Sequence, residues 1–288
     1  MIMACMISPS WSASLDKLWI EQLPAYEFKT VTVNECGEVI DSQTCLTHQL
    51  ILDLKNGISL ELVAIPGGIF QMGSPGRVGF DDEHPQHIVN IAPFLIGKTL
   101  VTQEQWSAVM RKCLPWRFHG SKIPVENISW YDAVEFCQRL SKLTGQTCRL
   151  PSEAQWEYAC KAGTQSTFTF GPTLTTDLAN YVGEYIYLNE PKGIYRHTPT
   201  EGGTFPPNAF GLFDMHGNLW EWCADVWHAG YTGAPIDGST WESGEKGALR
   251  VLRGGSWHEP PANCRSTVRL GQPPGDREDF FGFRVAIT

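Results

Sequence analysis

At 288 residues the chain can bury a sizeable core, and we expect one large domain rather than two small ones. It carries 22 basic and 31 acidic residues and has no cluster of Lys and Arg of the kind that a phosphate backbone needs, so no nucleic acid partner is expected. Its apolar runs are far shorter than the roughly 20 residues that cross a bilayer. The chain also begins without the basic start and cleavage site of a secretory signal, which predicts a soluble, cytoplasmic protein without a membrane span.

Composition divides the chain near residue 58. Before that point, residues 26–54 alternate apolar and polar side chains around a turn at Glu35 to Gly37, which predicts a β-hairpin that could extend the edge of the main sheet. We therefore expect an N-terminal extension over residues 1–57 and a main domain over residues 58–288.

The main domain is predicted to open with short strands. Two flank the Pro-Gly-Gly turn of "SLELVAIPGGIFQMGS", an exposed loop follows in "GSPGRVGFDDEHPQ", and "HIVNIAPFLIGKTLVT" predicts another strand pair. Three helices are then expected after the capping residues Thr102, Ser129 and Ser152, with Gly145 and Gly163 ending the second and the third.

After Gly163 the chain is rich in Gly, Pro, Asn, Asp and aromatic residues and shows only short strand-like pieces. So long a loop-rich stretch needs ions, function or dense packing to order it. The 11 Trp residues of the chain indicate aromatic packing as one such support.

Asp214 and Glu221 lie on either side of a Gly-Asn turn. A turn that exposes carbonyl groups between two carboxylates suits a hard cation such as Ca²⁺. The alternative is structural, with Asp214 capping the turn and Glu221 paired with an arginine.

Arg253 and Arg284 stand beside glycines in two segments that resemble buried strands. Buried arginines need carboxylate partners, which Glu221, Asp225 or Glu157 could supply. A structural role is therefore expected for both arginines.

Cys264 is the lone cysteine near the C-terminus. It would be a nucleophile if a base or a cation, such as nearby Arg265 or Arg269, lowered its pKa, and an inert thiol is the alternative. The histidines lack zinc-ligand spacing. Neither a phosphate-binding glycine loop nor a Gly-x-Ser-x-Gly motif is present in the sequence.

An ordered series of motifs resembles the formylglycine-generating enzyme family, also called the sulfatase-modifying factor family. The motifs are "IPGGIFQMGS", "DEHPQHIVNIAPFLIGKTLVTQEQW", "PVENISWYDAVEFCQRLS", "RLPSEAQWEYACKAGT", "FPPNAFGLFDMHGNLWEWCADVW", "LRGGSW" and "GFRV". The resemblance covers residues 58–288. It implies an α+β fold, a variant of the C-type lectin fold, with small twisted antiparallel sheets, a few helices, extensive ordered loops and often bound calcium.

Active members of this family carry two cysteines after the "GGS" motif that jointly bind copper(I) to oxidise a substrate cysteine. Alignment on "GGSW" places Glu259 at the first cysteine position and Cys264 at the second. Because copper(I) prefers soft sulfur ligands, the resemblance implies that copper is not bound and that formylglycine formation is lost. The sulfoxide synthases of this fold need a further helical domain, for which residues 1–57 are too short.

The resemblance also implies calcium sites. One maps onto the side chains of Asp214 and Glu221 and the carbonyl groups of Gly217 and Leu219. A second begins at Asn180 and the carbonyl group of Tyr181.

The C-terminal segment resembles the variable region of diversity-generating retroelement proteins, in which diversified residues between fixed "GGSW" and "GFRV" motifs line a ligand-binding surface. Both motifs are intact here, and the N-terminal stretch resembles the lead-in of cyanobacterial members. The candidate ligand-binding segment is residues 257–281. Its expected contact residues, with side chains free of structural duty, are His258, Glu259, Pro260, Ala262, Thr267, Val268, Leu270, Gln272, Pro273, Gly275, Glu278, Asp279, Phe280 and Phe281.

The sequence therefore predicts a non-catalytic protein that binds a protein or another macromolecule through a variable surface. The alternative is a formylglycine-generating oxidase in which Cys264 acts on a substrate cysteine.

Overall fold

The computed structural model describes residues 20–112, 114–245 and 247–288. The start of the N-terminal extension, with Cys5, lies outside the described residues, and so does Cys113. Within the described ranges, no helix combines the length and the apolar character that crossing a bilayer requires.

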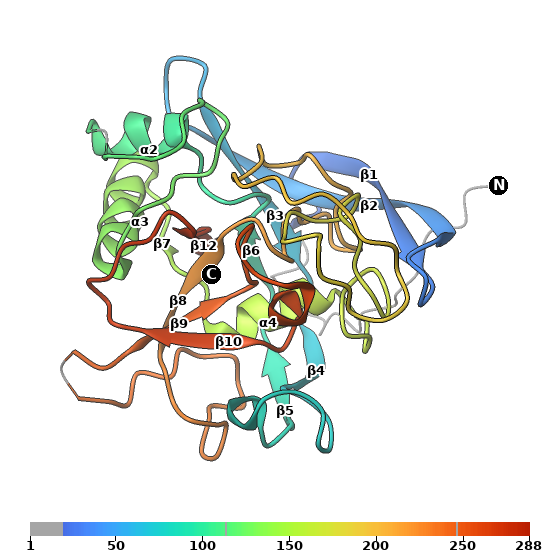
Figure 1. Ribbon diagram of the computed structural model, residues 1–288. Helices are drawn as coiled ribbons and strands as arrows, with labels where there is room; N and C mark the ends of the chain where they lie inside the picture. Colours follow the sequence, from blue (N-terminus) through green and yellow to red (C-terminus); the bar gives the residue numbers. More distant parts are fainter. Residues whose placement is uncertain (1–19, 113, 246) are drawn as a thin grey trace.

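The largest sheet has six strands in the order β1-β2-β3-β6-β12-β7, and each neighbouring pair is antiparallel (Figure 1). Its chain order differs from its spatial order, because the C-terminal strand β12 lies between β6 and β7. The strands are β1 (Ala25–Val33), β2 (Val39–Asp53), β3 (Ser59–Ile65), β6 (Phe94–Gly97), β7 (Cys148–Arg149) and β12 (Ala286–Ile287).

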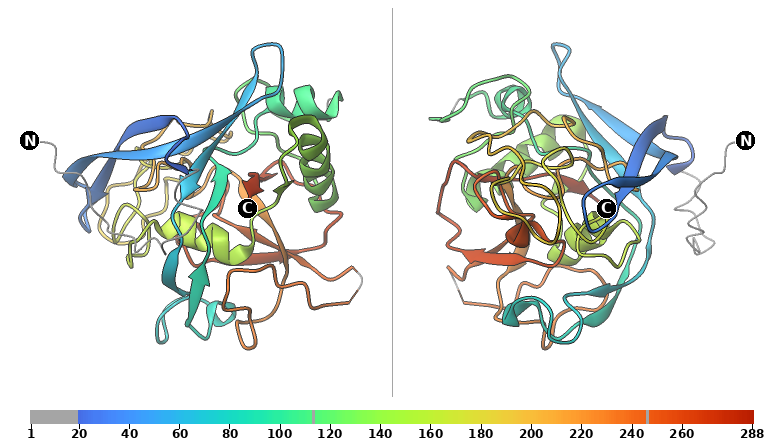
Figure 2. Two further views of the ribbon diagram at one scale, coloured as in Figure 1. Left: turned by 180° about the vertical axis from the view of Figure 1, so that it is seen from behind. Right: turned by 45° about the vertical axis from the view of Figure 1, so that its right-hand side comes forward.

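Strands β1 and β2 form the hairpin that the alternation of the sequence predicts, and β2 continues the sheet into β3. The hairpin projects from one side of the molecule in both views of Figure 2. Its turn region is fixed to the loops after α4 (Glu153–Lys161), because the N–H of Val33 donates to the carbonyl of Phe170 and the N–H of Asn189 donates to that of Glu35. The extension and the main domain thus share one sheet.

The next four strands exist as predicted, but their pairing differs from the expected order. Strand β3 pairs with β6, whereas β4 (Gly68–Met72) pairs with β5 (His87–Ile91) in a separate sheet. The two connections lie side by side at Gly67, where a Cβ would lie 2.8 Å from Cδ of Pro93. Strand periodicity specifies which residues are extended and leaves the partner open, so the sequence could not supply this exchange.

The three helices begin as predicted. Each has a complete capping box, centred on Thr102, Ser129 and Ser152 respectively. Gly145 is the left-handed C-cap of α3, whereas the left-handed C-cap of α4 is Ala162, one residue before the expected stop. The helices are α2 (Gln103–Met110), α3 (Trp130–Thr144) and α4 (Glu153–Lys161).

A second, four-stranded sheet has the order β10-β9-β8-β11, with β8 and β11 parallel and the other pairs antiparallel. Its strands are β8 (Trp220–Val226), β9 (Arg250–Arg253), β10 (Arg269–Gln272) and β11 (Phe281–Gly282). The candidate segment begins after β9 and includes the 3-10 helix η2 (Pro261–Cys264), β10 and the start of β11. The α+β class is confirmed, and the second sheet positions the segment.

Candidate functional site

The candidate segment, residues 257–281, is held at both ends by buried aromatic residues. Trp257 is 4% exposed, and its N–H donates to the carbonyl of Asn218 at 2.8 Å. Its indole Nε1 donates across the segment to the carbonyl of Asp279 at 3.4 Å. Phe283, just beyond the far end, is fully buried in the largest hydrophobic cluster.

Gly255 of the "GGSW" motif must be glycine for two reasons. Its φ is +75°, in the left-handed region that a side chain disfavours. A Cβ at this position would also lie 2.6 Å from Sγ of Cys264. The motif therefore brings the chain close to η2.

The two arginines expected to be buried are both fully buried and paired with carboxylates. Arg284 donates to both oxygens of Glu221, through Nε at 2.6 Å and a terminal nitrogen at 2.7 Å. Arg253 donates to Glu157 at 2.5 Å and to Glu153 at 3.1 Å. The predicted partners Glu221 and Glu157 are thus confirmed.

Asp225, the third expected partner, accepts from two backbone N–H groups instead, those of Glu153 and Trp241. Burial and the negative charge of Glu153 raise the pKa of Asp225 to about 7. Its role is to hold the start of α4 rather than to pair with an arginine.

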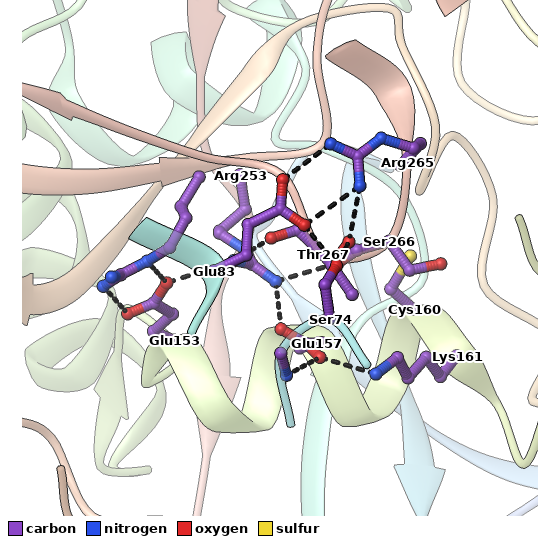
Figure 3. Close-up of polar contacts among 12 residues, drawn as sticks. Ser74, Glu83, Glu153, Glu157, Cys160, Lys161, Arg253, Arg265, Ser266 and Thr267 are labelled. Atoms are coloured by element: carbon purple, nitrogen blue, oxygen red, sulfur yellow. Dashed lines mark hydrogen bonds and ion pairs between the residues drawn. The ribbon is translucent and has the colours of Figure 1, made fainter. Parts of the chain in front are cut away.

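Two further arginines, Arg265 and Arg269, anchor the candidate segment from within. Arg265 donates to both oxygens of Glu83, at 2.6 and 2.9 Å, and Figure 3 shows the two side chains facing each other. Arg269 donates to both oxygens of Glu153 at 2.7 Å. Neither arginine approaches Cys264 as an activating cation; both fix the backbone of the segment to the core.

Glu83 was expected in an exposed loop and is fully buried. Burial alone would raise the pKa of its carboxyl, but hydrogen bonds from Arg265, Ser74 and Thr267 hold that pKa at about 2. This burial could not be predicted, because the loop is rich in Gly and acidic residues.

Replacing Glu83 with Gln is expected to lower the free energy of unfolding more at pH 6 than at pH 3. The folded pKa lies below the ordinary value of 4.5, so the stabilisation is fully present above about pH 4.5 and is lost as the pH falls toward 2. Urea unfolding at both pH values, with the exposed Glu245→Gln as control, measures the difference. An equal loss at both pH values would contradict a charged Glu83.

Cys264 is fully buried, and its Sγ donates to the carbonyl of Pro260 at 3.7 Å. Burial raises the pKa of the thiol, and the negative charge of Glu259 raises it further. Glu259 itself accepts hydrogen bonds from Asn263 at 2.6 Å and from Trp220 at 3.4 Å. Copper(I) prefers thiolate ligands, whereas this position offers one protonated thiol and a carboxylate that already accepts two hydrogen bonds. These two groups do not fit copper(I).

The structure places the fourteen candidate contact residues in different environments. Val268 and Phe281 are 3% and 2% exposed and belong to the largest hydrophobic cluster, so their assignment as contact residues is wrong. Leu270 and Phe280 are partly buried against the same cluster, which contradicts the expectation that they are free of structural duty. Hydrophobic side chains in this segment mainly stabilise the core.

Thr267 lies in a different environment from the other candidate residues. Its hydroxyl oxygen accepts from Arg265 at 3.0 Å, and it lines a cavity of about 1500 Å³ next to β2, β4 and β5. Thr267 therefore belongs to the Glu83 network rather than to a surface shared with His258.

The other candidates remain accessible. His258, Pro273, Gly275 and Glu278 are exposed, and Glu259, Pro260, Ala262, Gln272 and Asp279 are half-buried. They do not form one continuous set, because β10 carries Gln272 beside β9, whereas His258 and Asp279 lie next to Trp257.

Aromatic residues from distant loops complete the surface around Trp257. The ring of Phe118 lies edge-on to Trp257 at 5.7 Å, and the ring of Tyr195 is stacked at 6.3 Å. The Tyr195 hydroxyl is hydrogen-bonded to Nδ1 of His258 at 2.8 Å. Sequence reasoning missed Phe118 and Tyr195, because neither loop carries a signal beyond its aromatic content.

The residues of the first expected calcium site fit a cation only in part. Oδ1 of Asp214 is buried without a hydrogen-bond partner among the described residues, which suits an oxygen-seeking ion. Glu221 fits less well, because Arg284 occupies both of its oxygens and Trp156 donates to one of them. Gly217 and Leu219 follow Asp214 in the turn and are both buried, and the described residues contain no group of three or more acidic, His or Cys side chains that could hold a metal.

The second expected calcium site is also mixed. Asn180 is fully buried, and its Oδ1 lacks a partner among the described residues, but its carbonyl accepts from the N–H of Asn218 at 2.8 Å. Tyr181 is buried, with its hydroxyl donating to the carbonyl of Leu174 at 2.7 Å.

The extent of the fold matches a known family. The sequence model of one protein family, the sulfatase-modifying factor enzyme 1-like domain, matches residues 55–288. This range includes the four-stranded sheet and the candidate segment. The chain belongs to this family. The formylglycine-generating type of C-type lectin-like fold is thereby confirmed.

Family members of different activity are about equally similar to the chain. Formylglycine-generating enzyme of Thermomonospora curvata is 29% identical, over 80% of this chain and 94% of that protein. Inactive C-alpha-formylglycine-generating enzyme 2 of Bos taurus is also 29% identical, over 82% and 90%. Overall identity therefore does not decide activity in the sulfatase-modifying factor family.

Two solved structures are similar over most of the chain. PvdO from Pseudomonas aeruginosa has a TM-score of 0.72 and 35% identity, over 83% of this chain and 97% of PvdO. Treponema denticola variable protein 1 has a TM-score of 0.72 and 27% identity, over 83% of this chain and 98% of that protein.

Proposed function

We propose that this chain is a non-catalytic ligand-binding protein that presents residues 257–281 to a protein or another macromolecule. The observation that carries the proposal is the division of roles within the segment. Trp257, Arg265 and Arg269 fix its backbone to the core, whereas His258 and Glu278 remain exposed. A fixed backbone reduces the entropy lost on binding, which favours a display role.

The second candidate function is a formylglycine-generating oxidase, favoured by the similarity to the enzyme of Thermomonospora curvata. Against it stand the carboxylate at position 259 and the buried thiol of Cys264.

We also propose that a retroelement diversifies this segment. The similarity to Treponema denticola variable protein 1 supports this, and so does the burial of Trp257 and Phe283 at the two ends of the segment. The expected genomic result is a neighbouring reverse transcriptase gene and a near-copy of the codons for residues 253–285, and absence of both would contradict diversification.

A combined variant tests the display role. Replacing His258, Pro273 and Glu278 together with Ala is expected to change the free energy of unfolding by no more than about 1 kcal/mol, because exposed side chains contribute little. Val268→Ala, in the same segment but buried, is expected to cost about 2 kcal/mol. Loss of cooperative urea unfolding in the combined variant would contradict a display surface.

We further propose that calcium binds at Asp214 with the carbonyl groups of Gly217 and Leu219. Calcium is then expected to raise the melting temperature of the native chain and a chelator to lower it, because an ion that binds only the folded state stabilises it. Asp214→Asn is expected to remove this response, whereas Asp225→Asn, at another buried carboxyl, should retain it. If calcium does not change the melting temperature of the native chain, the proposal is overturned.

A further inference from the structure

A group of aromatic rings and carboxylates surrounds the buried Trp257. The ring of His258 lies at 5.1 Å from that of Trp257 and is stacked on that of Phe280 at 6.0 Å. We call the following set the aromatic-acidic patch: the rings of Phe118, Tyr195, Trp257, His258 and Phe280 and the carboxylates of Glu126, Glu184 and Asp279.

The charges of two of the carboxylates act on the hydroxyl of Tyr195. Burial raises the pKa of Tyr195, the charge of Glu184 raises it further, and Asp279 acts in the same direction. Within the described part of the chain, Glu184 is exposed and forms no ion pair. The patch therefore holds a negative charge that no cation of the described chain pairs with.

Glu126 adds a buried carboxyl group next to the backbone of Arg117 and Phe118. It is fully buried, and one oxygen accepts from the N–H groups of Arg117 at 2.5 Å and Phe118 at 3.2 Å. Its other oxygen, Oε2, has no hydrogen-bond partner among the described residues. Buried carboxylate oxygens are normally satisfied, so this one points to a missing donor or cation.

One cation already occupies part of the patch. Arg117 forms an ion pair with Asp279, and its guanidinium carbon lies 5.2 Å from the ring centroid of Phe118 and 6.0 Å from that of Trp257. The side chain of Arg117 is 62% exposed, so this pair is weak and exchangeable. The rings and the carboxylate thus have a geometry that accepts a guanidinium group.

We propose that the aromatic-acidic patch receives an arginine or lysine side chain of a partner protein. The proposal rests on the proposed ligand-binding function and gives its partner a chemical class. An incoming cation would face the half-buried rings of Phe118 and Tyr195 and pair with Glu184 or, by displacing Arg117, with Asp279. An anionic partner would instead meet the carboxylates of the patch in a chain whose formal net charge is -9.

The test uses three capped peptides, tetra-arginine, tetra-glutamate and tetra-norleucine, titrated into the ¹⁵N-labelled full chain. Tetra-arginine is expected to shift the amide resonances of residues 257–259 and 279–281, and the other two peptides are not. Arg117→Ala is expected to tighten tetra-arginine binding about two- to five-fold, because it frees Asp279, whereas Glu184→Gln weakens it by a similar factor. Arg77→Ala and Glu245→Gln, both exposed elsewhere, should leave the affinity unchanged.

The outcomes separate this proposal from the function on which it rests. Shifts with tetra-glutamate that Arg117→Ala abolishes would show an anion site, which overturns the cationic partner and leaves ligand binding intact. Equal shifts with tetra-norleucine, insensitive to Glu184→Gln, would reduce the patch to apolar contact and also overturn it. If no peptide shifts these amides, the proposal fails, while the combined surface variant decides the display role independently.

Discussion

Replacing Arg269 with Met is expected to lower the free energy of unfolding by about 3–5 kcal/mol, the usual loss when one partner of a buried ion pair is removed. Arg269 is 4% exposed and donates to both oxygens of Glu153, and its remaining terminal nitrogen donates to the carbonyl groups of Asp82 and His228 at 2.9 Å. After the substitution, Glu153 keeps only Arg253 and the Tyr231 hydroxyl as side-chain donors among the described residues. The negative charge of Glu153 then stays buried without the two hydrogen bonds from Arg269.

A matched variant lies in the same segment. Arg277 pairs with Asp132 at 2.5 Å but is 41% exposed, so Arg277→Met is expected to cost no more than about 1 kcal/mol. Urea unfolding of both variants gives the comparison. Equal losses would mean that the position within residues 257–281, rather than the buried pair, determines the cost, and the anchoring role of Arg269 would be wrong.

Local signals in the sequence predicted local structure well. The capping residues Thr102, Ser129 and Ser152 define helix starts through hydrogen bonds within four residues, so no distant partner is needed. Strand pairing depends on contacts far apart in the chain. The strand partners on either side of Gly67 and Pro93 therefore could not be predicted from the apolar-polar periodicity of the sequence.

The buried charges show the same limit. Arg253 and Arg284 could be predicted because they stand in apolar, glycine-rich segments, and their carboxylates lie in equally apolar surroundings. Glu83 could not, because its loop is mostly polar, whereas in the fold Glu83 is fully buried and paired with the distant Arg265. A polar segment is exposed by default, and only the fold reveals that a distant cation covers it.

The candidate surface was predicted in part. The two ends of the candidate segment, at Trp257 and Phe283, could be predicted from the "GGSW" and "GFRV" motifs. The other residues around Trp257 come from loops that carry no motif. Phe118 and Tyr195 reach Trp257 only through the path of the chain. The errors at Val268 and Phe281 have the opposite cause, since a chemically mixed segment still contributes side chains to the core.

Replacing Glu259 with Cys is expected to raise the affinity of the chain for copper(I). The substitution supplies a second sulfur beside Cys264 and removes the negative charge that raises the pKa of that thiol. Copper(I) selects thiolate ligands, so the affinity should rise by more than about 100-fold, the upper range for changes in outer-shell partners alone. Competition with a chromogenic copper(I) chelator under reducing conditions measures it.

Two controls assign the effect to the pair of sulfurs. Glu278→Cys adds a thiol at an exposed position of the same segment and should leave copper(I) affinity near the native value. Glu259→Cys combined with Cys264→Ser should abolish the gain, because one sulfur is removed. Native protein that already binds copper(I) as tightly as the Glu259→Cys variant would show that a carboxylate at this position is compatible with the metal. The oxidase would then replace ligand display as the better account of the chain, since the argument against it rests on Glu259 and the buried Cys264.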